Sequence, residues 1–180
     1  MIEPSKDSLS GLARLNSLPP AVAEAELRKC CGSSEWARRM TMARPFINDY
    51  ELASKAEEIW WSLSPSDWLQ AFRCHLKIGE RRAAQPVEVD EQRWSEQEQS
   101  GMRTASQGKF KELEELNRVY EERFGYIFII CATGKTPDEM LAALRSRLDH
   151  GPEEELRCAA AEQAKITKLR LDKLMKDVAG

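Results

Sequence analysis

Residues 49–63, with the sequence DYELASKAEEIWWSL, are the stretch that most clearly predicts the fold. Its apolar residues recur every three or four positions and so fall on one face of a helix. They are Leu52, Ala56, Ile59, Trp60 and Leu63. A helix with one apolar face must bury that face against another element. The flanking sequence therefore has to supply partners for it.

Helix start and stop signals lie on both sides of this stretch. Pro19-Pro20 divides an earlier helical region, residues 12–29, and a Gly-Ser-Ser turn at 32–34 precedes a short helix over residues 36–42. Ser64-Pro65 combines an N-cap residue with proline at the first helical position, which starts a new helix. The region before residue 75 therefore reads as a series of short helices.

A longer helix is expected to end at Gly125. Its inner face carries Phe110, Leu113, Leu116, Tyr120 and Phe124. Residues 126–132 are β-branched and aromatic, but no second strand-like run could pair with them. We therefore expect a buried helical or extended connection there.

Two further helices complete the fold. Residues 136–139, with the sequence TPDE, form a capping-box pattern that opens a helix to about Leu148. Gly151-Pro152 opens a final helix over residues 153–176, and Ser95 is expected to begin another after a polar loop at 79–90. The sequence thus predicts an all-α fold, a single-domain bundle of about eight helices over residues 11–176. A flexible N-terminal tail is expected over residues 1–10.

Composition and charge exclude several classes of protein. The chain has 180 residues, of which 42% are hydrophobic and 32% charged, as expected for a folded domain with a core. A net charge of -3 provides no basic face for nucleic acid, and the longest apolar run, residues 126–132, is too short to span a membrane. Five cysteines without C-x-x-C spacing argue against a disulfide framework, and the N-terminus lacks the apolar core of a secretory signal. The cytoplasm is the expected location.

His75 is the first candidate for chemistry. Histidine titrates near neutral pH and is the most common general acid or base, whereas the plainer interpretation is a ring held by a backbone carbonyl. His150 lies at a helix end beside Gly151, where a cationic group is favoured, so we expect it to be structural.

Ser95 and Glu98 match a capping box, in which Ser95 caps a helix and Glu98 reaches back to it. Glu98 and Gln99 could also present a carboxylate and an amide at a helix start, where anionic oxygens bind. Arg170 shares the apolar stripe of the last helix, so it belongs either to a buried ion pair or to a clamp for a substrate carboxylate or carbonyl. Without a metal-ligand cluster or phosphate loop in the sequence, convergence of these groups predicts a cofactor-free enzyme for a small, polar, anionic molecule.

The sequence that contains these residues resembles the OHCU decarboxylase family from about residue 15 to residue 174. OHCU is 2-oxo-4-hydroxy-4-carboxy-5-ureidoimidazoline, the last unstable intermediate of urate oxidation. The motifs that carry the resemblance are ARPF at 43–46, HLKIG at 75–79, WSEQEQSG at 94–101, FIICA at 128–132 and KITKLRL at 165–171. Residues 30–34 and 126–132 are most similar to the decarboxylase half of plant allantoin synthases.

The resemblance implies an all-helical homodimer that needs no cofactor or metal and converts OHCU to (S)-allantoin in urate degradation. It also implies functional coupling to 5-hydroxyisourate hydrolase. By this resemblance His75 and Glu98 are catalytic. The expected substrate-binding residues are Leu76, Ser95, Glu96, Gln97, Glu98, Gln99, Phe128, Ile129, Ile130, Cys131, Ala132 and Arg170.

Leu76 is a departure from the family pattern, which usually has proline directly after the histidine. Proline would restrict that turn and remove an N–H group, so Leu76 loosens the placement of His75. This departure favours one alternative, a catalytically weakened binding module of the same fold. A lyase for another small polar acid is the second alternative.

Overall fold

Proline begins four helices in the part of the chain that the structure describes. The structure is a computed structural model, and it describes residues 10–75 and 107–176. The helices that start at proline are α2 (Pro20–Cys31), α5 (Pro65–Arg73), α8 (Pro137–Leu148) and α9 (Pro152–Lys176). Proline suits the first helical position because its φ angle is already helical and the N–H that it lacks would have no intrahelical acceptor there. The others are α1 (Gly11–Ser17), α3 (Ser34–Met42), α4 (Asp49–Trp61) and α7 (Gln107–Phe124).

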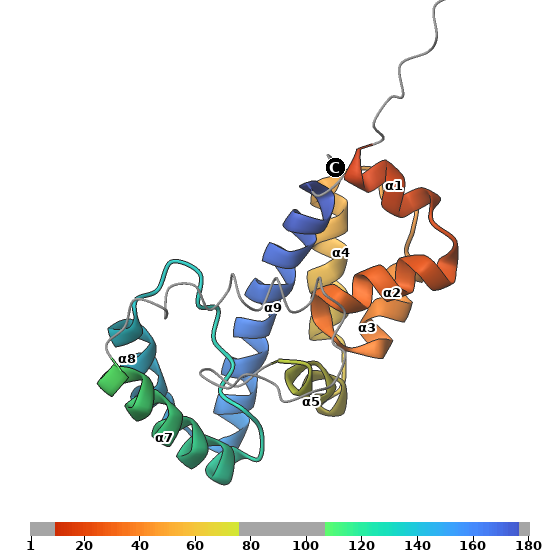
Figure 1. Cartoon of the computed structure of the whole chain (residues 1–180). Helices are drawn as coiled ribbons and strands as arrows, with labels where there is room; N and C mark the ends of the chain where they lie inside the picture. Colours follow the sequence, from red (N-terminus) through yellow and green to blue (C-terminus); the bar gives the residue numbers. More distant parts are fainter. Residues whose placement is uncertain (1–9, 76–106, 177–180) are drawn as a thin grey trace, which may run out of the picture. The chain divides into compact units, whose positions relative to one another are not determined.

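These eight helices, with no strand among residues 10–75 and 107–176, confirm the predicted all-α fold (Figure 1). Residues 125–136 contain no helix, so the connection before α8 is extended, which is one of the two forms that we expected. The predicted helix at Ser95 and the loop at 79–90 lie outside the described residues. None of the helices in the described ranges is long and apolar enough to cross a membrane.

Contacts along the chain divide it into two compact units. The first unit comprises residues 1–64 and 166–180, and the second comprises residues 65–165. The division falls within α9, so the beginning of this helix belongs to the second unit and its end to the first. The expected division into an N-terminal tail, residues 1–10, and a single domain, residues 11–176, stays a prediction.

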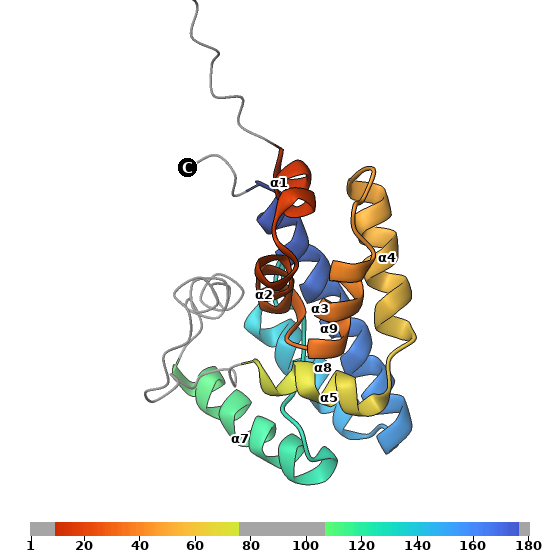
Figure 2. The same ribbon diagram turned by 90° about the vertical axis from the view of Figure 1, so that its right-hand side faces the viewer.

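In the first unit, α3 packs against both α2 and α4 (Figure 2). Trp36 of α3 is fully buried, and its indole N–H donates to the carbonyl of Ala56 in α4 at 3.0 Å. A buried indole N–H needs such an acceptor, because an unsatisfied polar group in a core is costly. Trp36 therefore links α3 to α4 by packing and by a hydrogen bond.

The ARPF motif at residues 43–46 also has a structural role in the first unit. The Arg44 guanidinium donates to the carbonyls of Leu15 and Leu18 at 2.6 and 2.9 Å, and so caps the end of α1. The Asn16 side chain forms two hydrogen bonds with the backbone of Phe46, at 2.8 and 2.9 Å. These bonds join the α3–α4 connection to α1.

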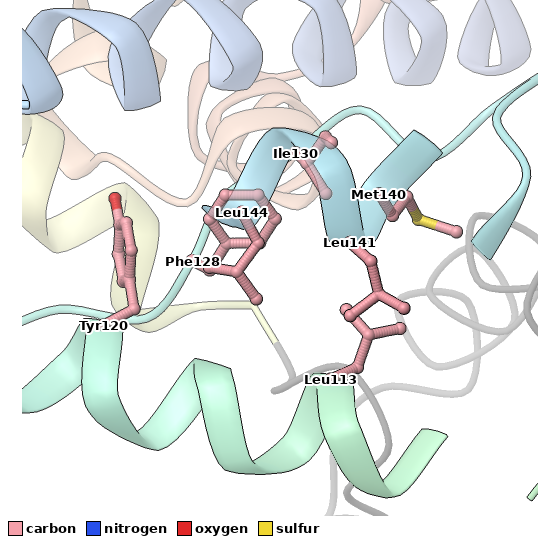
Figure 3. Close-up of a cluster of buried hydrophobic side chains, with 7 residues drawn as sticks. All are labelled: Leu113, Tyr120, Phe128, Ile130, Met140, Leu141 and Leu144. Carbon is pink, nitrogen blue, oxygen red and sulfur yellow. The ribbon is translucent and has the colours of Figure 1, made fainter. Parts of the chain in front are cut away.

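The second unit has a core between α7 and α8, into which the extended connection inserts two side chains (Figure 3). Phe128 and Ile130 are the inserted residues. They lie in one cluster with Leu113 and Tyr120 of α7 and with Met140, Leu141 and Leu144 of α8. Gly125, with a φ angle of 80°, ends α7 as predicted and turns the chain into this connection.

Candidate functional site

His75 lies just after the end of α5, in the second unit. Its backbone N–H donates to the carbonyl of Phe72 at 3.2 Å, which continues the last turn of the helix. Phe72 and Trp68 of α5 are buried. The packing of α5 therefore determines where the His75 backbone lies, while the ring itself is only partly buried.

The His75 ring is held by a side-chain amide. Its Nε2 atom lies 2.6 Å from Oε1 of Gln163, a residue of α9 that is fully buried. The plainer expectation was that a backbone carbonyl holds the His75 ring. At Nε2 the hydrogen-bonding partner is instead the side-chain oxygen of Gln163. A buried amide must be hydrogen-bonded to offset its desolvation, so the interaction serves both residues.

The FIICA segment, residues 128–132, lies in the same unit, and polar side chains hold its backbone. The carbonyl of Ile129 accepts from Arg147 at 2.7 Å. The N–H of Cys131 donates to Glu162 at 2.8 Å, and its carbonyl accepts from Lys135 at 2.9 Å. These bonds fix an extended backbone that has no neighbouring strand in the described residues to pair with.

Two consecutive residues of α9 therefore contact two predicted parts of the site. Glu162 holds Cys131, and Gln163 holds His75. Burial raises the pKa of Glu162, but Lys165 at 2.5 Å and the Cys131 N–H outweigh burial and lower it. The carboxylate of Glu162 is thus favoured as the charged acceptor for the segment.

A buried network around Glu155 also supports the segment. Glu155 accepts from Arg147 at 2.8 and 2.5 Å and from the hydroxyl of Tyr120. The Arg147 guanidinium also lies 4.5 Å from the ring centre of Phe128, a favourable cation–π distance. Burial lowers the pKa of Arg147, but the Glu155 hydrogen bonds more than compensate and raise it. Arg147 therefore acts as a permanent cation between Glu155 and the segment.

His150 belongs to this network, which agrees with its expected structural role. Its Nδ1 atom lies 2.8 Å from Glu155. The ligand atoms of His150, Glu155 and Cys158 lie within 4.8 Å of one another, a spacing that a metal ion could use. Arg147 already offsets the charge of Glu155, so a further cation is disfavoured and an ion-pair network explains the cluster better.

Arg170 is buried, as its place in the apolar stripe of α9 predicted. It lies in the first unit, where it is close enough to interact electrostatically with Cys30. Burial raises the pKa of the Cys30 thiol, although the positive charge of Arg170 opposes that effect. These contacts leave the role of Arg170 as a substrate clamp a prediction.

Several expected site residues lie outside the described residues. They are Leu76, Ser95, Glu96, Gln97, Glu98 and Gln99. Among the predicted site residues that the structure describes, His75 and the whole segment from Phe128 to Ala132 belong to the second unit.

Sequence reasoning missed Gln163 and Glu162, although a signal for Gln163 was present. Gln163 precedes Ile166 by three residues and Arg170 by seven, so all three share one face of α9. A polar residue on a buried helical stripe must find a polar partner, as we argued for Arg170 alone.

A sequence model of the family described as OHCU decarboxylase matches residues 16–172 of the chain. The chain belongs to the OHCU decarboxylase family. This confirms the resemblance that the motifs carry, and the match extends over parts of both compact units.

Individual members of the family agree with this assignment. The uric acid degradation bifunctional protein TTL of Arabidopsis thaliana is 42% identical over 160 residues, which cover 88% of this chain and 49% of that protein. The 2-oxo-4-hydroxy-4-carboxy-5-ureidoimidazoline decarboxylase of Amia calva is 34% identical, over 73% of this chain and 75% of its own length. The chain thus spans about half the length of the bifunctional protein and three quarters of the single decarboxylase.

A solved structure is similar in fold as well as in sequence. A crystal structure of an OHCU decarboxylase in the presence of (S)-allantoin superposes with a TM-score of 0.72 at 42% identity. The match covers 84% of this chain and 98% of the solved chain. The described helices are therefore those of a known decarboxylase fold.

Proposed function

We propose that the chain catalyses the decarboxylation of OHCU to (S)-allantoin in urate degradation. Membership of the family, with the family model matching residues 16–172, is the observation that carries this proposal. The similarity to a decarboxylase structure solved with (S)-allantoin supports the same reaction.

The chemistry explains why a small polar site suffices. The substrate carbon that carries the carboxylate also carries a hydroxyl group and adjoins unsaturated ring atoms. The electron pair that remains after loss of carbon dioxide can spread into that ring, so the substrate supplies its own electron sink. The protein has to orient the substrate, exclude water and deliver a proton to one face.

We assign the roles as follows from the family resemblance. His75 acts at the hydroxyl and carboxylate, first as a base and then as a proton donor. Glu98 accepts from ureido or ring N–H groups, and Gln99 and Arg170 hold the carbonyls. Leu76, Ser95, Glu96, Gln97 and the segment Phe128–Ala132 complete the binding site.

We also propose that the chain is a cytoplasmic homodimer that works downstream of a 5-hydroxyisourate hydrolase. The fusion of activities implied by the name of the Arabidopsis bifunctional protein supports such coupling. Sedimentation of the purified chain should give twice the monomer mass, and a monomer would refute the dimer.

The activity can be tested by generating OHCU in situ from urate with the two upstream enzymes and following circular dichroism. OHCU also decays spontaneously to racemic allantoin, so a rapid chiral signal that scales with added protein indicates catalysis. Racemic product at the uncatalysed rate would instead favour the binding module or a lyase for another acid.

His75→Asn should fold normally yet lose decarboxylation by about a hundredfold or more, because a general acid–base group contributes about 10²–10⁴ in rate. The chain has two histidines, so His150→Asn is a matched control that should retain activity per folded molecule. Full activity in His75→Asn would refute the assignment.

A further inference from the structure

The contact between His75 and Gln163 specifies which ring nitrogen carries a proton. Gln163 lies on α9, 88 residues along the chain from His75, and its Oε1 atom is 2.6 Å from Nε2. An amide oxygen carries no hydrogen, so it can only accept. The proton of this hydrogen bond therefore belongs to Nε2 of His75.

An amide oxygen is also too weak a base to remove that proton. In a neutral imidazole one nitrogen is a donor and the other is an acceptor. With Nε2 protonated, the lone pair that gains and loses a proton is on Nδ1. A carboxylate at this position would hold the same nitrogen but would also favour the charged ring.

The surroundings keep this hydrogen bond in place. Gln163 is fully buried, so loss of the contact with His75 would carry the cost of a buried amide oxygen that has lost a donor. Its neighbour Glu162 accepts from the Cys131 N–H, so this part of α9 is also tied to the extended connection within the second unit. On the other side, Phe72 anchors the end of α5 by burial and by accepting from the His75 N–H.

We propose that Gln163 is a positioning residue that holds His75 with its proton on Nε2, so that Nδ1 exchanges the proton with substrate. This inference rests on the proposed function for its catalytic meaning. The tautomer itself can be measured without any substrate.

The first test is nitrogen NMR of the ¹⁵N-labelled protein at about pH 8, where an ordinary imidazole is largely neutral. There are two histidines, so the His150→Asn variant assigns the signals. We expect His75 to show a protonated Nε2 and an unprotonated Nδ1. A protonated Nδ1 with an unprotonated Nε2 would overturn the inference, because Gln163 would then have to donate through its amide nitrogen.

The second test compares two substitutions of similar length. Gln163→Met removes the acceptor, so the preference for protonated Nε2 should be lost and kcat should fall about tenfold to a hundredfold with little change in KM. Gln163→Glu keeps an acceptor and adds a charge, so the tautomer should persist and the acid limb of the kcat profile should move to higher pH. Gln70→Met makes the same amide-to-thioether change on α5, the helix that carries His75, and should leave the His75 signals unaltered.

The outcomes separate this inference from the proposed function. A wild-type chain that does not act on OHCU refutes the function, whatever the tautomer. An active wild-type chain with Nδ1 protonated, or a Gln163→Met variant with unchanged tautomer and kcat, refutes the inference alone. If Gln163→Met does not fold, the inference is still tested by the His75 tautomer in the wild-type spectrum and by the pH profile of Gln163→Glu.

Discussion

Glu155 shows how differently neighbouring residues of one type are used. It lies in the first turn of α9 together with Glu153 and Glu154, where acidic side chains favour the positive end of the helix. Glu153 and Glu154 are exposed, whereas Glu155 is fully buried and bonded to Arg147, Tyr120 and His150. The three residues are alike in the local sequence, but only Glu155 lies in the core of the second unit.

We expect Glu155→Gln to reduce the free energy of unfolding by about 3–5 kcal/mol, because it leaves the Arg147 charge buried without a partner. Urea unfolding at neutral pH measures the change. Glu154→Gln, one residue away and exposed, is the control and should change stability by less than about 0.5 kcal/mol. Equal effects of the two substitutions would show that the buried network contributes little.

At the scale of helices, α8 begins with the capping box that its sequence predicts. The Thr136 hydroxyl accepts from the Glu139 N–H at 3.2 Å, and the Glu139 carboxylate accepts from the Thr136 N–H at 2.7 Å. The pKa of Glu139 is lowered below its ordinary value of 4.5, mainly by the hydrogen bond from the Thr136 backbone and also by the Thr136 side chain. The charged carboxylate therefore stabilises the start of the helix.

This cap makes stability depend on pH in a defined direction. A lowered pKa in the folded state means that the stabilisation is present above the ordinary pKa and is lost as the pH falls through the lowered value. Glu139→Gln should therefore be less stable than the wild type at pH values above the ordinary pKa, and the difference should vanish in acid. Urea unfolding of both proteins, at pH values from below the lowered pKa to above the ordinary one, measures this difference in stability. A difference that grows in acid would contradict the prediction.

The packing of α1 on α9 in the first unit allows a second prediction about helices. A methyl group added at Gly11 would lie 2.6 Å from the Cα atom of Met175 and would collide with its carbonyl, neither of which can move independently of the helix. Alanine normally favours a helix over glycine by about 1 kcal/mol, but here the collision should dominate. We expect Gly11→Ala to destabilise the protein by about 1–3 kcal/mol. Gly151→Ala, where a methyl group meets no atom within 4 Å, is the thermal-unfolding control and should be tolerated.

At the scale of the whole molecule, the start of the folded region can be tested by truncation. Ser10 caps α1, because its hydroxyl accepts from the Ala13 N–H at 3.2 Å. Deleting residues 1–9 should leave activity and Tm unchanged, since this cap stays intact. Deleting residue 10 as well should cost about 1 kcal/mol, the usual contribution of an N-cap. A loss of folding on the shorter deletion would place part of the predicted tail within the domain.

The helices themselves were determined by the local sequence. Prolines at Pro65 and Pro137, the capping box at Thr136 and the glycine at Gly125 act on the backbone within a few residues, so their effects can be predicted without any tertiary structure. The burial of Arg170 followed from helical spacing for the same reason. Family motifs in the sequence further indicated His75 and the segment 128–132 as site residues.

Only the tertiary structure decided which side chains meet. Gln163 contacts His75 across 88 residues of sequence, and Glu155 contacts Tyr120 across 35. Helical spacing shows which face of α9 is buried, but it carries no information about which residue of another helix lies opposite that face. The packing of the helices within a unit decides which residue lies opposite. Each buried polar group needs a hydrogen-bonding partner, and that partner can come from any part of the chain that the packing brings close.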